Sequence, residues 1–216
     1  MDSRQVKEQV LEHKVIAIVR GVEASRIIPT VEALYDGGIR LVEVTIDHDQ
    51  ADAVQRTAAK IQAIGNHFGS DICVGAGTVL TAEQVAAMAE AGAQYMISPH
   101  VDANVIRKTK ELGKVSIPGA LTPTEAVTAY TAGADFVKLF PAGELGIPFI
   151  KALMAPLRHI PMLAVGGVTP DNVRIFLDSG MSGVGVGGNL VLKNAIETDA
   201  FEEITAAAKR FLQNIK

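Results

Sequence analysis

Short apolar runs alternate with longer amphipathic segments along the whole chain. The apolar runs are rich in β-branched residues and lack strict polar alternation, which is typical of strands buried on both faces of a parallel sheet. The eight predicted strands span residues 15–19, 41–46, 72–76, 95–98, 115–118, 136–140, 162–165 and 183–186. The segments between them have helical periodicity, so the pattern predicts eight strand–helix units.

Local signals mark the ends of the predicted helices. Thr81 with Gln84, and Thr122 with Glu125, match the capping box, and Thr169-Pro170 places proline at a helix start. Glycines that favour a left-handed helix end stand at Gly37, Gly38, Gly92, Gly113, Gly133 and Gly180. Eight units in 216 residues predict one α/β domain over residues 1–216, a (β/α)8 TIM barrel. An additional N-terminal helix over residues 4–13 is expected to cover the barrel floor.

Composition and charge exclude several classes of partner. The net charge is −4 and the basic residues form no stripe, so no nucleic acid partner is expected. The apolar runs are too short to cross a bilayer, and the N-terminus lacks the apolar core of a signal peptide. The single cysteine, Cys73, lies in an apolar run and is predicted to pack in the core. These features predict a cytoplasmic protein without membrane contact.

The helix-ending glycines set a register for the strands that follow. Four residues lie five positions after such a glycine: Glu43, Ile97, Lys138 and Gly185. They belong to alternate strands, whose side chains share interior layers in this fold. Glu43 and Lys138 are therefore expected to face each other across the barrel, beside the space that Gly185 leaves.

A buried ammonium and a buried carboxylate are costly unless they are paired or used in chemistry. One interpretation of Lys138 and Glu43 is a structural ion pair that plugs the barrel. The other is catalysis, because a desolvated lysine becomes a nucleophile toward carbonyls and a carboxylate beside it can move protons. The residues alone leave both interpretations open.

Several motifs together resemble one enzyme family. Residues 136–142, which contain Lys138, resemble the Schiff-base segment of 2-keto-3-deoxy-6-phosphogluconate (KDPG) aldolases. Residues 42–45 resemble the acid/base strand of that family. Further similar segments are residues 18–21, 75–80 and 97–99 and the pairs Gly166-Gly167 and Gly187-Gly188. The resemblance covers nearly the whole chain in order.

This resemblance implies a class I aldolase. Lys138 would form a Schiff base with a keto acid, and Glu43 would shuttle protons. The implied substrate-binding residues are Arg20, Thr78, Pro99 and Phe140. The implied phosphate-binding residues are Gly166, Gly167, Gly187, Gly188 and Asn189, in the loops where barrels frequently bind phosphate. Without the resemblance, Thr78 and the glycines could equally be tight-turn residues, and Phe140 could equally be an aromatic residue of the core.

The implied reaction cleaves a 2-keto-3-deoxy-6-phospho sugar acid, 4-hydroxy-2-oxoglutarate, or both, to pyruvate and an aldehyde. Its partners are thus a small keto acid and a phosphorylated aldehyde, and the resemblance also implies a homotrimer. The covalent lysine needs no cofactor and no metal. His48 and His100 could join nearby carboxylates as metal ligands, but no metal-binding spacing supports this, and His48 is expected to be a surface residue.

Three positions depart from the family pattern. Asp47 stands where the family has a carboxylate-binding arginine, Val165 replaces a threonine, and His100 replaces a small residue and is expected to narrow the mouth. Altered recognition around intact Schiff-base residues favours a shifted keto-acid substrate. The competing hypotheses are a barrel isomerase or synthase without covalent catalysis, which has no use for Lys138, and a non-catalytic phosphometabolite-binding barrel.

Overall fold

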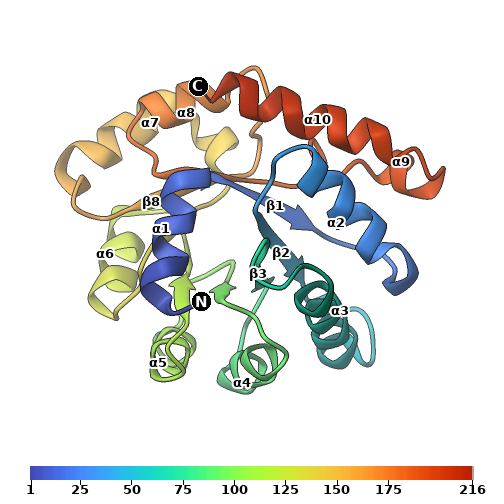
Figure 1. Ribbon diagram of the computed structural model, residues 1–216. Helices are drawn as coiled ribbons and strands as arrows, with labels where there is room; N and C mark the ends of the chain where they lie inside the picture. The colour runs from blue at the N-terminus through green and yellow to red at the C-terminus, as the bar shows by residue number, and fades with distance from the viewer. Residues whose placement is uncertain (216) are drawn as a thin grey trace.

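The chain forms a barrel of parallel strands surrounded by helices, shown by a computed structural model that describes residues 1–215 (Figure 1). The sheet has the order β5-β4-β3-β2-β1-β9-β8-β7-β6. The strands are β1 (Val15–Val19), β2 (Leu41–Thr45), β3 (Cys73–Gly77), β4 (Tyr95–Ile97), β5 (Val115–Ile117), β6 (Gly119–Ala120), β7 (Val137–Leu139), β8 (Met162–Val165) and β9 (Gly183–Val186). The two terminal strands of this order are neighbours in sequence, so the sheet curls around on itself and the predicted TIM-type barrel is confirmed.

One predicted strand is divided. The fifth run was expected to be continuous through Pro118, but β5 ends before this residue and β6 begins after it. Proline has no N–H to donate to a ladder. The β5 strand pairs with β4, and β6 pairs with β7, while the Pro118 carbonyl accepts from the Lys138 N–H at 2.8 Å. The strand count therefore rises from eight to nine without a change of architecture.

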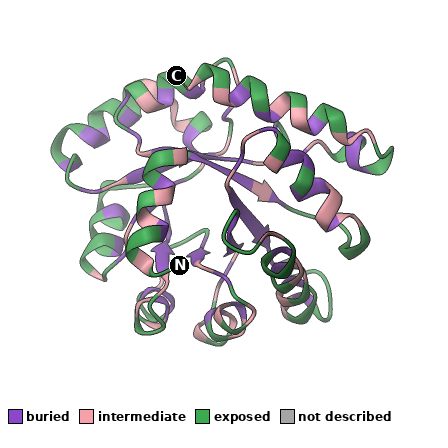
Figure 2. Cartoon of the chain, in the orientation of Figure 1, coloured by how far each residue is buried: buried purple, intermediate pink, exposed green. Residues whose placement is uncertain are grey.

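Helices cover the outer face of the barrel. Their bounds are α2 (Ile27–Asp36), α3 (Ala53–Phe68), α4 (Ala82–Glu90), α5 (Ala103–Glu111), α6 (Pro123–Thr131), α7 (Ala142–Leu157), α8 (Val173–Asp178), α9 (Lys193–Glu197) and α10 (Phe201–Asn214), with a 3-10 turn η1 at Ala24–Arg26. Figure 2 shows buried residues on the sheet and on the helix faces turned to it, and exposed residues on the outer faces. No helix within residues 1–215 is long and apolar enough to cross a bilayer.

The predicted helix ends are mostly confirmed, with three corrections. The capping box of Thr122 and Glu125 is present. Thr81 caps α4, but the Gln84 side chain accepts from the N–H of Leu80 at 2.7 Å rather than from that of Thr81. The helix predicted to start at Thr169-Pro170 starts three residues after Pro170, because residues 170–172 form a turn. Left-handed φ angles are found at Gly38, Gly92, Gly113, Gly133 and Gly180 but not at Gly37.

The N-terminal helix α1 (Ser3–His13) closes one end of the barrel, as predicted. Val6 and Val10 are buried in the apolar cluster that fills the barrel interior. Cys73 lies in the same cluster, and burial raises the pKa of its thiol to about 12. The thiol is therefore protonated at neutral pH, and the prediction that Cys73 is a core residue is confirmed.

Candidate active site

A cavity of about 670 Å³ opens at the carboxyl ends of the strands, where barrel enzymes place their sites. All eleven predicted site residues line it. They are Lys138, Glu43, Arg20, Thr78, Pro99, Phe140, Gly166, Gly167, Gly187, Gly188 and Asn189. The remaining lining residues are mainly apolar, including Ile18 and Val186. The sequence prediction therefore selected residues that the fold brings to one place.

Lys138 and Glu43 reach this cavity from β7 and β2. Their exposed fractions are 9% and 2%, so both ionisable groups are buried. Gly185 lines the cavity with them, as the register predicted. Ile97 also faces the barrel interior, as expected, but it packs in the interior apolar cluster and does not line the cavity.

The two groups form no structural ion pair. Within residues 1–215, neither the Lys138 amine nor the Glu43 carboxylate has an ion-pair partner within 4.0 Å or a side-chain hydrogen bond. A direct ion pair that plugs the barrel is therefore not supported, although each group attracts the charged form of the other. Both groups face open cavity instead.

Burial favours the uncharged form of each group. Desolvation lowers the pKa of the Lys138 amine, with a smaller contribution from Arg20 in the same direction and an opposing one from Glu43. Desolvation raises the pKa of the Glu43 carboxyl, against the attraction of Lys138 and Arg20. A lowered pKa makes the free amine, which is the nucleophile, more accessible, and a raised pKa does the same for the protonated carboxyl, which is a proton donor.

Glycine at position 77 makes room for the carboxyl group. A Cβ atom added to Gly77 would lie 1.7 Å from Oε1 of Glu43. The Glu43 side chain thus lies against the carboxyl end of β3, where any larger residue would displace it.

Replacement of Gly77 by alanine is expected to lower kcat/KM roughly 100-fold, because it moves the Glu43 carboxyl by a sizeable fraction of an ångström or more. Steady-state kinetics on the folded variant would measure this. Gly65→Ala is the matched control, since Gly65 lies in α3 with open space around it. That variant should keep full activity and gain about 1 kcal/mol of stability. Equal activity of both variants would contradict the assigned position of Glu43.

Phe140 and Thr78 line the same cavity as the amine. Nζ of Lys138 lies 4.8 Å from the centroid of the Phe140 ring, and the ring is 40% exposed. Phe140 is therefore a wall of the cavity rather than a core aromatic. Thr78 has a φ of 57°, and its hydroxyl accepts from Nη2 of Arg20 at 3.4 Å. Hydroxyl and guanidinium are thus adjacent donors, suited to a carboxylate.

The glycine loops form the other end of the cavity. Gly166 and Gly167 have φ values of 89° and 71°, which a side chain rarely tolerates. Among the described residues, the N–H groups of Gly167, Gly188 and Asn189 have no hydrogen-bond partner. The Asn189 side chain donates to the carbonyl of Val168 at 2.8 Å and so joins the two loops. Free backbone donors at two joined loops are suited to a phosphate.

Lys193 is a lining residue that the sequence prediction missed. It stands at the start of α9, beside the glycine loops, and its side chain is 88% exposed. Nζ lies 3.5 Å from the carboxylate of Glu197, one turn along the helix. Its position in the sequence could have indicated this place, because Lys193 follows the Gly187-Gly188 pair by only a few residues.

The three departures from the family pattern have different outcomes. Val165 lines the cavity, but His100 does not, so the expected narrowing of the mouth by His100 is not supported. Asp47 lines a separate small pocket with Arg56 and Lys60 and does not line the active-site cavity. Within residues 1–215, no three His, Cys, Asp or Glu side chains converge on a possible metal position.

The chain is similar to named aldolases over most of its length. A family model described as KDPG and KHG aldolase matches residues 6–207. The chain is 40% identical over 176 residues to 2-dehydro-3-deoxy-6-phosphogalactonate aldolase of Escherichia coli strain K12, covering 81% of this chain and 83% of that protein. It is 31% identical to the KHG/KDPG aldolase of the same strain, covering 93% and 91%.

A solved structure shares the fold. KDPG aldolase from Legionella pneumophila, described as holding pyruvate captured at low pH as a covalent carbinolamine intermediate, matches with a TM-score of 0.84 and 27% identity. The match covers 94% of this chain and 96% of that one. With the family model spanning most of the chain, this protein belongs to the KDPG and KHG aldolase family, whose members are carbon–carbon lyases.

Proposed function

We propose that the protein is a class I aldolase that binds its keto acid as a Schiff base on Lys138. The observation that carries the proposal is the pair of buried, mutually unpaired groups, Lys138 and Glu43, facing one cavity. A protein gains nothing in stability from burying an amine and a carboxyl without direct partners. Such groups are typical of an active site.

The proposed reaction begins with attack of the Lys138 amine on the keto carbon. The carbinolamine that forms loses water to give an iminium, with Glu43 donating the proton to the departing hydroxyl. The C3–C4 bond then breaks, its electrons move into the iminium to give an enamine, and the C4 hydroxyl passes its proton to the ionised Glu43 and becomes the aldehyde. Glu43 returns this proton to C3 of the enamine, and hydrolysis releases pyruvate and restores the amine. No metal or other cofactor takes part in these steps.

The two ends of the cavity support a phosphorylated keto acid as substrate. Arg20 and Thr78 would bind the carboxylate, and the N–H groups of Gly167, Gly188 and Asn189 would bind a phosphate. We propose a 2-keto-3-deoxy-6-phospho sugar acid, with the galactonate isomer as the first to assay because of the 40% identical relative. Cleavage of 4-hydroxy-2-oxoglutarate, a shifted keto-acid substrate and the homotrimer stay predictions.

Reductive trapping tests the covalent step. The protein is incubated with pyruvate and sodium borohydride, which reduces an iminium to a stable amine, and its intact mass is measured. The expected result is a mass increase equal to pyruvic acid less one oxygen atom, located on Lys138 by peptide mapping. A folded protein that binds pyruvate without forming the adduct would overturn the proposal and favour a non-catalytic binding barrel.

Replacement of Lys193 by methionine is expected to weaken use of phosphorylated substrates selectively. The ammonium lies at the proposed phosphate end, so kcat/KM for the 6-phospho sugar acid should fall about 10-fold, as for loss of one charge-assisted contact. The value for 4-hydroxy-2-oxoglutarate, which has no phosphate, should stay unchanged. Lys209→Met, on the exposed face of α10, is the control. An equal loss of kcat/KM for both substrates would show that the phosphate does not bind beside Lys193.

A further inference from the structure

The turn that presents Thr78 is conformationally strained. Its φ of 57° lies in the left-handed region, which β-branched residues rarely adopt. The two residues after Thr78 are held by hydrogen bonds. Ser98 donates to the Val79 carbonyl at 2.7 Å, and the N–H of Leu80 donates to the Gln84 side chain at 2.7 Å. These contacts fix Val79 and Leu80, and the Val79 N–H donates to the Ile97 carbonyl at 3.1 Å. The Thr78 carbonyl, on the other side of that peptide, requires a contact of its own.

His48 supplies that contact. Its Nε2 lies 2.9 Å from the carbonyl oxygen of Thr78. A carbonyl only accepts, so Nε2 carries the hydrogen in this arrangement. Thr78 is thus held at two points, its carbonyl by His48 and its hydroxyl by Arg20. Because His48 belongs to the loop after β2, the hydrogen bond joins the loop that follows the Glu43 strand to the loop that follows β3.

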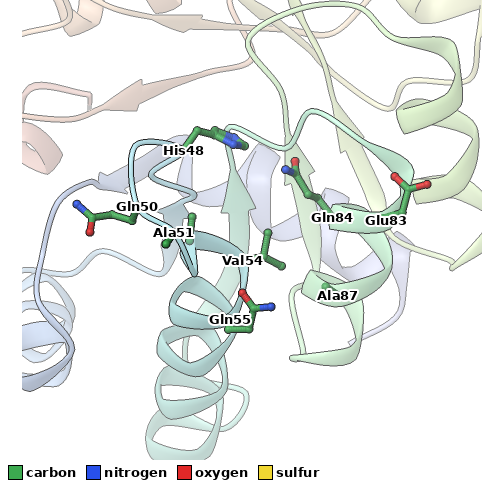
Figure 3. Close-up of a pocket in the computed structure, with 9 residues that line it drawn as sticks. His48, Gln50, Ala51, Val54, Gln55, Glu83, Gln84 and Ala87 are labelled. Atoms are coloured by element: carbon green, nitrogen blue, oxygen red, sulfur yellow. The ribbon is translucent and has the colours of Figure 1, made fainter.

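The histidine approaches from outside the active-site cavity. It lines a separate groove of about 510 Å³ between α3 and α4, together with Gln55 and Gln84. Figure 3 shows the His48 ring at the top of this groove, turned toward the loop between β3 and α4, with Gln84 reaching toward the same loop from α4. His48 therefore contacts the back of the turn, whereas Thr78 lines the active-site cavity on its other side.

We propose that His48 is a positioning residue for keto-acid binding. By holding the Thr78 carbonyl, it keeps the strained turn in the conformation that places the Thr78 hydroxyl, and with it the Arg20 guanidinium, toward the substrate carboxylate. Without the imidazole donor, the backbone at Thr78 relaxes toward negative φ and carries the hydroxyl away. This inference rests on the proposed function, because it assumes that the carboxylate binds at Arg20 and Thr78.

The test measures pyruvate binding apart from the aldehyde half of the reaction. Half-saturating pyruvate concentrations for borohydride trapping are compared for wild type, His48→Ala, His48→Gln and Thr78→Ala. His48→Ala is expected to raise this concentration about 3- to 10-fold, the loss typical of one hydrogen bond, with kcat changed less than KM in the full reaction. His48→Gln, whose amide nitrogen reaches the Nε2 position, should restore most of the affinity. Gln55→Ala, in the same groove, is the control.

A double variant separates positioning from general loosening of the fold. If His48 acts through Thr78, His48→Ala adds little in a Thr78→Ala background. An unchanged pyruvate concentration in folded His48→Ala, additive losses in the double variant, or no rescue by glutamine would each overturn the inference while the adduct on Lys138 still forms. Absence of the adduct in wild type would overturn the proposed function itself, so the two failures are distinguishable.

Discussion

Replacement of Lys138 by methionine is expected to abolish both the reduced pyruvate adduct and the aldolase activity. The amine is the covalent nucleophile in the proposed reaction, and no other residue can form the iminium at that point in the cavity. The loss in kcat should be on the order of 10⁴-fold or more, as expected for removal of a group on which every later step depends. Intact mass after borohydride treatment and a coupled pyruvate assay would measure the two effects.

Stability supplies the control for this variant. Methionine has a length similar to that of lysine and removes an amine whose burial is unfavourable, so the free energy of unfolding should stay equal or rise. Lys138→Arg extends the comparison, since a guanidinium retains positive charge but cannot form the iminium. An adduct that persists in the methionine variant would assign the Schiff base to a different lysine, with Lys193 as the candidate in the same cavity.

The sequence predicted the elements of the site well because regular geometry decides them. Gly38 and Gly133 each end a helix, and Glu43 and Lys138 each lie five residues later, in the next parallel strand. That spacing brought both residues to the cavity. The same spacing also gave Ile97 an inward direction on β4, but there the side chain packs in the apolar interior and does not line the cavity.

Loop conformation and side-chain direction were beyond prediction. Asp47 follows Glu43 by four residues, but it lies beyond the end of β2, where no ladder sets its direction. It is exposed and faces the small pocket of Arg56 and Lys60. The hydrogen bond of His48 to Thr78 joins residues thirty positions apart in two loops, and no periodic pattern encodes such a contact. In the proposed function the substrate carboxylate binds at these loops, so substrate choice is less predictable than reaction class.

The active site is arranged at a cost to stability. Lys138 and Glu43 each lose hydration without gaining a direct ion pair, and Thr78 adopts a left-handed conformation. The surrounding barrel offsets these costs through its two apolar clusters, one inside the sheet and one between sheet and helices. The groups that disfavour folding are those that the proposed reaction uses, which is the expected relation between activity and stability.

Replacement of Glu43 by glutamine is expected to separate these two properties. The amide keeps the shape of the side chain but cannot exchange a proton with substrate, so kcat should fall roughly 10²- to 10⁴-fold, the usual contribution of acid–base catalysis. The pyruvate adduct should still form, at a lower rate, because Lys138 is unchanged. Steady-state kinetics and the time course of borohydride trapping would measure the two. Full activity would assign proton transfer to water or to another residue.

The pH dependence of stability provides the second readout for the Glu43 variant. Burial raises the pKa of Glu43 in the folded state, so its contribution to stability is full below the unfolded pKa and is lost as pH rises through the folded pKa. Glutamine does not ionise. The free energy of unfolding of Glu43→Gln should thus match that of wild type below the unfolded pKa of the carboxyl and exceed it at alkaline pH. A wild type that is the more stable protein at alkaline pH would instead show that the attraction of Lys138 and Arg20 outweighs desolvation, and that Glu43 reacts from its ionised form.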